Sequence, residues 1–215
     1  MAELTLVIGN KNYSSWSLRP WVAMTHFQIP FAEVLIPLFM PRSKARLLDN
    51  SPSGKVPALK HADIVVWESI AILEYLADLF PEKDLWPKDT RARAYARSVS
   101  AEMHAGFMNL RKNCPMNIKA DRSQTVLNED AQRDVERITE LWEDCRKRFG
   151  RGGEFLFGDF SNADAMYAPI IWRCNSYGIN LTGTSKKYFD SMISLPAMKE
   201  WQEAALKETW VIEGH

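Results

Sequence analysis

The chain has 215 residues, a mass of 24.7 kDa, and 27 basic against 27 acidic side chains, so its formal net charge is zero with histidine neutral. This length allows one large domain or two small ones, and an apolar share of 46% supplies a real core and argues against disorder. Because charge is also balanced on either side of residue 87, the sequence gives no reason to expect nucleic acid as a partner.

The sequence also lacks the marks of a membrane or exported protein. Its longest apolar runs are far shorter than the roughly 20 residues that span a bilayer, and its first residues do not form an export signal. Three widely spaced cysteines, Cys114, Cys145 and Cys174, form no C-x-x-C pair and no zinc-ligand cluster with histidine. We therefore expect a soluble, reduced, cytoplasmic protein that binds neither a metal ion nor a membrane.

Strand and helix patterns alternate over the first eighty residues. Strands are predicted at 4–8, 31–38, 56–59 and 64–66, and helices at 16–27, 43–49 and 68–80. The last two strands are separated only by residues 60–63, which is typical of a hairpin. The order βαβαββα predicts a parallel crossover unit followed by a hairpin and a covering helix.

The pattern changes after residue 80. A polar, proline-bounded connector at 81–87 is followed by predicted helices alone, at 90–113, 132–149, from 161 toward 177, and at 197–207. Ser161 and Asp164 begin the third of these in the manner of a capping box, with Asp in place of the usual Glu or Gln. We therefore predict an α/β domain over residues 1–80, a linker over 81–89 and an all-α domain over 90–215.

A hydroxyl-rich turn, Asn12-Tyr-Ser-Ser-Trp-Ser-Leu-Arg-Pro20, connects the first predicted strand to the first helix. Ser14 and Ser15 stand at the helix start, where backbone N–H groups are unpaired and the helix dipole favours negative charge. A hydroxyl at this place can donate a hydrogen bond to an anion held there. The alternative is ordinary N-capping, for which serine is a preferred residue.

Two further segments carry polar or proline residues at the start of an element. In Gly54-Lys55-Val56-Pro57-Ala-Leu, proline at a strand start indicates an edge or a turn, and its peptide bond can be trans or, as in about 5–6% of X–Pro bonds, cis. In Trp67-Glu68-Ser69-Ile-Ala-Ile, Glu68 and Ser69 are placed to pair with an ammonium and a carboxylate. Each segment taken alone also fits a plain loop or a helix cap.

Together, and in this order, these segments resemble the cytosolic glutathione transferase superfamily over essentially the whole chain. Residues 14–19 are similar to the Ser-Ser-Cys-Ser-x-Arg signature of its zeta (maleylacetoacetate isomerase-like) class, and residues 55–59 and 68–72 are similar to its two glutathione-site segments. Residues 158–164 resemble the capping box of its C-terminal domain. The resemblance implies a thioredoxin-like N-terminal domain, an all-helical C-terminal domain and a homodimer.

The resemblance implies that glutathione is a co-substrate whose thiol is activated by Ser14, or in second place by Ser15 and in a distant third by Tyr13. A thiol of pKa about 8.5 is only roughly 3% thiolate at pH 7, and lowering that pKa by about two units requires about 2.7 kcal/mol. A donated hydroxyl bond together with a helix dipole supplies stabilisation of this order. Arg19 either orients these groups or is a solvated helix residue.

The same resemblance assigns the glutathione-binding residues. Lys55, Val56 and Pro57 form the segment in which Val56 would hold the cysteinyl backbone by strand-like pairing, which a cis Pro57 would expose. Glu68 and Ser69 would hold the γ-glutamyl end.

Three departures from the zeta pattern bear on the reaction. Trp16 replaces the zeta-class cysteine and no cysteine precedes Cys114, which excludes a mixed disulfide on an N-terminal cysteine. The class carries an arginine for its acidic isomerase substrate where this chain has Ser176, with Arg173 almost a turn earlier. Glu68 replaces the usual Gln. We therefore expect a transferase rather than an isomerase, with a glutathione-dependent cis-trans isomerase and a non-catalytic binding module as alternatives.

The second substrate is expected between the two domains, facing the first helix and the helix predicted at 90–113. Five residues are candidates for this pocket: Trp16, His104, Phe107, Met108 and Arg111. Such a lining suits a small, largely apolar electrophile. The alternatives are core packing for the Met and Phe residues and a surface or packing role for His104.

Overall fold

A computed structural model describes residues 3–212 of the chain. Four strands form one mixed sheet in the order β2-β1-β3-β4. Their bounds are Leu4–Ile8 for β1, Ala32–Leu35 for β2, Ala58–His61 for β3 and Ile64–Trp67 for β4. Strand β1 is parallel to β2 and antiparallel to β3, which forms an antiparallel hairpin with β4. The hairpin turn contains two residues, so the predicted four-residue connection at 60–63 is wrong.

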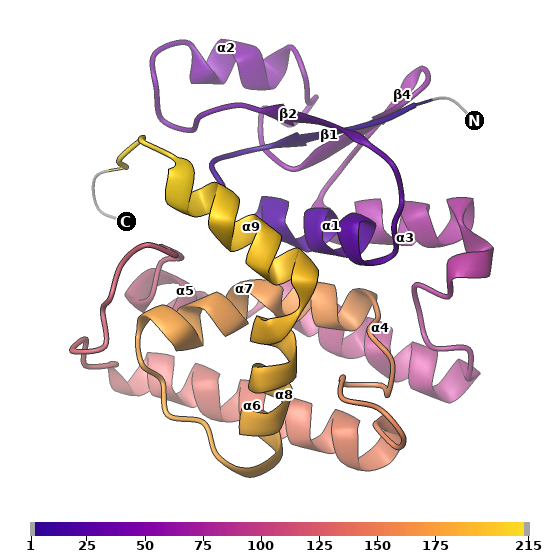
Figure 1. The fold of residues 1–215 in the computed structure, drawn as a ribbon, viewed down its shortest axis with the longest axis vertical. Helices are drawn as coiled ribbons and strands as arrows, with labels where there is room; N and C mark the ends of the chain where they lie inside the picture. The colour runs from indigo at the N-terminus through magenta and orange to yellow at the C-terminus, as the bar shows by residue number, and fades with distance from the viewer. Residues whose placement is uncertain (1–2, 213–215) are drawn as a thin grey trace.

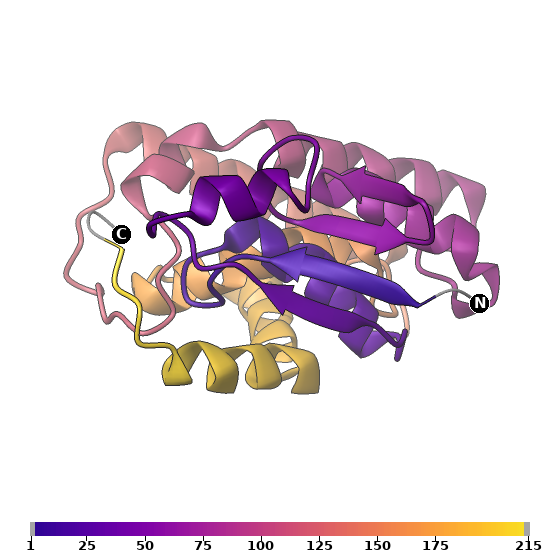
Figure 2. The same ribbon diagram turned by 90° about the horizontal axis from the view of Figure 1, so that it is seen from above.

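Helices cover both faces of this sheet (Figures 1 and 2). Helix α1 (Ser15–His26) and helix α3 (Ser69–Leu79) lie on one face, and the short α2 (Ser43–Leu48) lies on the other. Alternation along β1 explains this arrangement, because side chains of successive residues point to opposite faces. Leu6 and Ile8 belong to the main core with α1 and α3, whereas Val7 belongs to the smaller core beneath α2.

The rest of the described chain is helical and packs beneath α1 and α3 (Figure 1). A 3-10 turn at Pro81–Lys83 leads into it. Its helices are α4 (Thr90–Ala105), α5 (Met108–Asn113), α6 (Glu129–Phe149), α7 (Asn162–Ser176), α8 (Gly183–Ser194) and α9 (Pro196–Lys207). Helix α7 is buried on nearly every side and packs against α1, α4 and α8, and α9 packs beside α1. Among residues 3–212, no helix combines the length and apolar character needed to cross a bilayer.

The prediction of a thioredoxin-like domain followed by an all-helical part is confirmed, and so is the capping box. Ser161 is the N-cap of α7, and the Asp164 carboxylate accepts a hydrogen bond from the Ser161 backbone N–H at 2.8 Å. The helix predicted at 90–113 is wrong, because it is broken between α4 and α5. A Cβ on Gly106 would lie 2.9 Å from the Glu102 carbonyl oxygen, and Phe107 has a left-handed φ of 60°. Helix α8 was not predicted.

Candidate active site

The turn between β1 and α1 presents two serines at the start of α1. The backbone N–H groups of Tyr13 and Ser14 both donate to the Asn10 carbonyl, at 3.2 and 2.8 Å, and the Asn10 side chain accepts from the Leu38 N–H at 2.7 Å. Ser14 occupies the N-cap position, but its side chain makes no capping hydrogen bond, and Ser15 is the first helical residue. Capping therefore does not account for the Ser14 hydroxyl.

The Ser14 hydroxyl belongs to a short chain of hydrogen bonds. Its Oγ lies 2.7 Å from the Oγ of Ser17, which accepts the Gly9 N–H at 3.1 Å. If Ser17 donates to Ser14, the proton of Ser14 is free to point at a ligand. The Ser15 side chain has no hydrogen-bond partner within residues 3–212. Ser17 was not among the predicted site residues, although it stands one helical turn after Ser14.

A cavity of about 170 Å³ lies between the first turn of α1, the loop before β3 and the start of α3, and neither Ser14 nor Ser15 lines it. Its lining consists of Trp16, Ser53, Lys55, Val56, Pro57 and Glu68. The structure thus brings together four of the predicted binding residues, adds Ser53, and places the predicted pocket residue Trp16 with them. The Val56–Pro57 peptide bond is cis, and Glu68 has a positive φ of 67°.

Ser69 begins α3 but does not line the cavity, because its side chain is fully buried. Its Oγ accepts a hydrogen bond from Nη1 of Arg19 at 3.2 Å, and Arg19 also donates through Nε to the Met166 carbonyl at 3.1 Å. Arg19 is therefore not the solvated residue that one interpretation predicted. Burial lowers the pKa of Arg19 well below its ordinary value, and the nearby Arg111 and Arg173 lower it further.

Trp16 connects the cavity to the second predicted pocket. The guanidinium groups of Arg19 and Arg111 lie over its ring at 4.3 and 4.7 Å from the centroid, and the ring of His104 meets it edge-on at 5.1 Å. Nε2 of His104 lies 3.5 Å from a carboxylate oxygen of Glu68. Burial, followed by the charge of Arg19, lowers the pKa of His104, which disfavours the protonated ring that an ion pair with Glu68 requires.

Phe107 and Met108, the remaining two candidates for the second-substrate pocket, do not line the cavity as Trp16 does. Phe107 is almost completely buried in the main core, while Met108 is 52% exposed at the start of α5. Neither they nor His104 and Arg111 line the 170 Å³ cavity. The packing interpretation therefore holds for Phe107, and the site of a second substrate stays a prediction.

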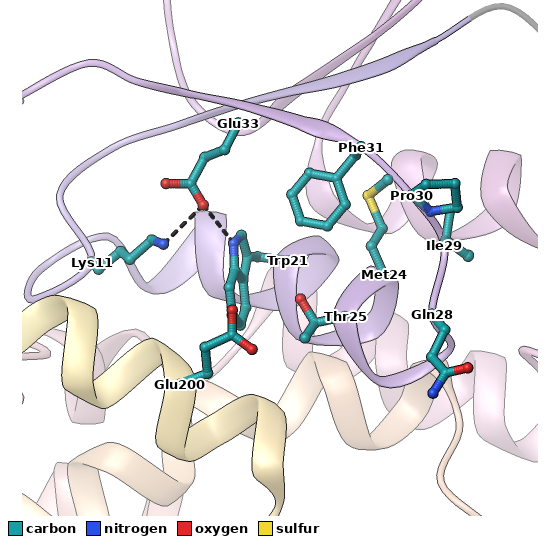
Figure 3. A pocket seen from close by; sticks show the side chains of 10 residues that line it. All are labelled: Lys11, Trp21, Met24, Thr25, Gln28, Ile29, Pro30, Phe31, Glu33 and Glu200. Carbon is teal, nitrogen blue, oxygen red and sulfur yellow. Dashed lines mark hydrogen bonds and ion pairs between the residues drawn. The ribbon is translucent and has the colours of Figure 1, made fainter.

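A different cavity, of about 480 Å³, lies between α1, the start of β2 and α9, and contains none of the predicted site residues (Figure 3). One oxygen of the Glu33 carboxylate accepts from the Trp21 indole at 2.7 Å and pairs with the Lys11 ammonium at 2.8 Å. Within the described part of the chain, no group of three or more His, Cys, Asp or Glu side chains is arranged to hold a metal ion.

Residues 13–79 match the family model of the glutathione S-transferase N-terminal domain, a segment that contains both serines and the whole lining of the 170 Å³ cavity. This part of the chain is a glutathione S-transferase N-terminal domain. A probable maleylacetoacetate isomerase from Caenorhabditis elegans is 27% identical over 188 residues, which cover 86% of each chain. Glutathione S-transferase Z2 from Arabidopsis thaliana is 26% identical over 201 residues, which cover 88% of each.

The fold is similar to that of a glutathione transferase over nearly the whole chain. A glutathione transferase homolog from Burkholderia gl BGR1, solved with bound glutathione, superposes with a TM-score of 0.71 at 22% identity. The match covers 96% of the present chain and all of that chain. The resemblance to the zeta class that was inferred from residues 14–19 is confirmed by the two relatives.

Proposed function

We propose that this protein is a glutathione transferase that stabilises the glutathione thiolate with Ser14 and directs it at a small electrophile. The observation that carries the proposal is the cavity lined by Lys55, Val56, Pro57 and Glu68, which lies next to the N-terminus of α1. Because Trp16 in the first turn of α1 lines the cavity, we expect a thiol peptide held there to direct its sulfur toward the hydroxyl groups of Ser14 and Ser15. The family membership of the segment supports the same function.

The lining offers one partner for each polar part of the tripeptide. The Lys55 ammonium pairs with a carboxylate, the Val56 backbone pairs with the cysteinyl amide, and the Glu68 carboxylate pairs with the γ-glutamyl ammonium. Ser69 does not touch the tripeptide in this arrangement. Its buried hydroxyl accepts a hydrogen bond from Arg19, which places the positive charge of Arg19 near the start of α3. A γ-glutamyl carboxylate at that helix start meets unpaired N–H groups and a favourable dipole.

Thiolate formation follows from the serine chain. The Gly9 N–H donates to Ser17. In the proposed mechanism the Ser17 hydroxyl is the donor of its 2.7 Å contact with Ser14, and Ser14 donates to sulfur, so each hydrogen bond polarises the next. The thiol proton leaves to solvent. The sulfur lone pair then forms a C–S bond with an electrophilic carbon, and the leaving group departs with the electron pair of the bond that breaks.

A glutathione-dependent isomerase is the second candidate, because one relative carries that name. Two residues weigh against it. Arg173 is buried, and it donates to the carbonyls of Cys114 and Pro169 at 2.8 and 3.2 Å. Ser176, at the place of the zeta-class arginine, donates to the Asn117 carbonyl at 2.9 Å. Neither side chain is free to hold an acidic substrate, so we favour transfer.

The proposal includes a cytoplasmic homodimer. Strand β4 is an edge of the sheet, and its Ile64 and Trp67 are 44% and 43% exposed. Exposed apolar groups on a sheet edge favour association. Sedimentation of the purified chain tests this part.

The experiment that tests the function compares Ser14→Ala and Ser15→Ala with the wild-type protein in an aryl-halide assay. We expect Ser14→Ala to lower kcat by roughly a hundredfold, as for loss of an oxyanion donor, and to leave the glutathione KM nearly unchanged. Ser98→Ala is the control, because Ser98 is exposed on α4 and donates only to the Ala94 carbonyl. Wild-type protein without turnover contradicts the function, and full activity in both variants contradicts the serine mechanism.

A further inference from the structure

The turn between β1 and α1, which contains Ser14, is hydrogen-bonded to Glu208 near the C-terminal end of the described chain. Glu208, which follows α9, is 8% exposed, and its two carboxylate oxygens each accept one backbone N–H. Oε1 accepts from Lys11 at 2.6 Å and Oε2 accepts from Asn12 at 3.0 Å, across 197 and 196 positions of sequence. Figure 1 shows the end of α9 beside the turn between β1 and α1. A carboxylate that accepts two N–H groups forms strong, charge-assisted hydrogen bonds.

The same two turn residues are fixed at further points. The buried indole of Trp201 on α9 donates to the Lys11 carbonyl at 2.8 Å, and the Lys11 ammonium pairs with Glu33 (Figure 3). The Asn12 side chain donates to Asn117 at 3.0 Å and accepts from the Lys119 N–H at 3.0 Å. These contacts leave the two N–H groups to Glu208.

Lys119 links the segment after α5 to the end of α9, because its ammonium donates to the Glu208 backbone carbonyl. The segment after α5 contacts Asn12, and the end of α9 contacts both Lys11 and Asn12. The next residues in the chain are Tyr13, Ser14 and Ser15, and the Ser14 N–H is itself bonded within this turn. A displacement of Lys11 or Asn12 must move the Ser14 hydroxyl, because only one residue separates Asn12 from Ser14.

We propose that Glu208 is a positioning residue of the transferase reaction, whose carboxylate fixes the turn at Lys11 and Asn12 so that the Ser14 hydroxyl points at the glutathione sulfur. This role rests on the proposed function. Glu208 does not line the glutathione cavity, so it acts through the turn alone.

The decisive variant is Glu208→Gln. The amide has the shape of the carboxylate but faces one of the two N–H donors with an NH₂ group, so one hydrogen bond is lost and the turn shifts. We expect the pKa of the bound glutathione thiol, followed by thiolate absorbance against pH, to rise, and kcat to fall roughly tenfold. The glutathione KM stays within about twofold, because the binding residues are elsewhere. Amide hydrogen exchange at Lys11 and Asn12 becomes faster.

Two variants complete the test. Glu203→Gln is the matched control, because Glu203 is an exposed glutamate of α9, and it leaves all four readouts unchanged. Lys119→Met changes an exposed residue, removes the ammonium that donates to the Glu208 carbonyl and lies near its carboxylate, and keeps the backbone N–H that donates to Asn12. It is expected to raise the thiol pKa by a smaller amount. It decides the question if Glu208→Gln does not fold, and an unchanged thiol pKa in Lys119→Met then overturns the role.

The outcomes separate this role from the function on which it rests. A Glu208→Gln protein that is less stable, but has the wild-type thiol pKa and kcat, overturns the positioning role and leaves the function intact. Wild-type protein that forms no glutathione thiolate overturns the proposed function, and the positioning role with it.

Discussion

The guanidinium carbon of Arg19 lies 4.3 Å from the centroid of the Trp16 ring, and Arg111 lies over the same ring at 4.7 Å. Arg19 is fully buried, and no carboxylate of the described residues lies within ion-pair distance of it. Its charge is met instead by the indole face, a carbonyl and the Ser69 hydroxyl. Trp16, which stands where the zeta class has cysteine, therefore links a wall of the 170 Å³ cavity to a buried positive charge.

Removing this charge is expected to weaken glutathione binding with little effect on stability. Arg19→Met removes the donor to Ser69 and Met166 but also removes a desolvated cation with an unpartnered Nη2, and these two effects on stability oppose each other. We predict a change of about 1 kcal/mol or less in the free energy of unfolding, measured with urea. The glutathione KM rises roughly tenfold, the equivalent of about 1.4 kcal/mol of binding.

The control for this prediction is Arg91→Met, because Arg91 is exposed at the start of α4. It removes the same side chain and charge at the surface, and both unfolding and KM stay at wild-type values. An Arg19→Met protein that binds glutathione normally contradicts a role of Arg19 behind Ser69.

A second prediction concerns Ser17, which touches Ser14 and not the cavity. In the proposed chain the Ser17 hydroxyl donates to Ser14, so the Ser14 proton can point at sulfur. Ser17→Ala removes this donor, and kcat is expected to fall roughly tenfold while the glutathione KM is unchanged. The double variant Ser14→Ala/Ser17→Ala is expected to be no slower than Ser14→Ala alone, because the two hydroxyls act in one chain. Additive losses in this double-mutant cycle contradict the chain of hydrogen bonds.

The sequence predicted what depends on local pattern. Lys55, Val56 and Glu68 were identified because residues 55–59 and 68–72 resemble the two glutathione-site segments of the superfamily, and the structure places all three on one cavity. The break between α4 and α5 was missed because Gly106 is required by a close approach to Glu102, which composition does not reveal. Glu208 was missed for a stronger reason: it binds backbone N–H groups 196 and 197 positions away, and such donors have no sequence signature.

A third prediction is that the three cysteines do not react in the folded protein. Cys114, Cys145 and Cys174 are buried, and burial raises their pKa values to about 11, 12 and 12. A thiol of pKa about 11 is only roughly 0.1% thiolate at pH 8. An aromatic disulfide reagent should therefore label no cysteine in minutes under native conditions and all three in urea. Rapid labelling of one thiol in the native protein contradicts this prediction.

A fourth prediction follows from His26, whose ring lies 4.1 Å from that of Phe160 at an angle of 31°. Burial lowers its pKa below the ordinary value of 6.5. The unfolded chain thus binds more protons just below pH 6.5, and stability is lost as the pH falls through this range. His26→Gln removes that contribution. Urea unfolding from pH 7 downward should give a shallower loss in the variant, and identical slopes in the two proteins exclude a contribution from His26.

The last prediction concerns the capping box of α7. The fully buried carboxylate of Asp164 accepts the Ser161 N–H at 2.8 Å, the Ser161 hydroxyl at 3.0 Å and the Leu156 N–H at 3.0 Å. Asp164→Ala leaves three buried donors unpaired at the start of a helix that packs against α1. Because each such group is expensive to bury, we expect a loss of about 3 kcal/mol or more in the free energy of unfolding.

Two further variants of the capping box give reference values for the loss of unfolding free energy in Asp164→Ala. Ser161→Ala removes only the N-cap hydroxyl and should cost about 1 kcal/mol, while Asp164→Asn keeps one acceptor oxygen and should fall between the two alanine variants. Urea unfolding gives the order directly. Since neither Ser161 nor Asp164 lines the 170 Å³ cavity, the folded fraction of each variant should keep the wild-type KM for glutathione. An Asp164→Ala protein as stable as Ser161→Ala would show that α7 does not depend on the carboxylate.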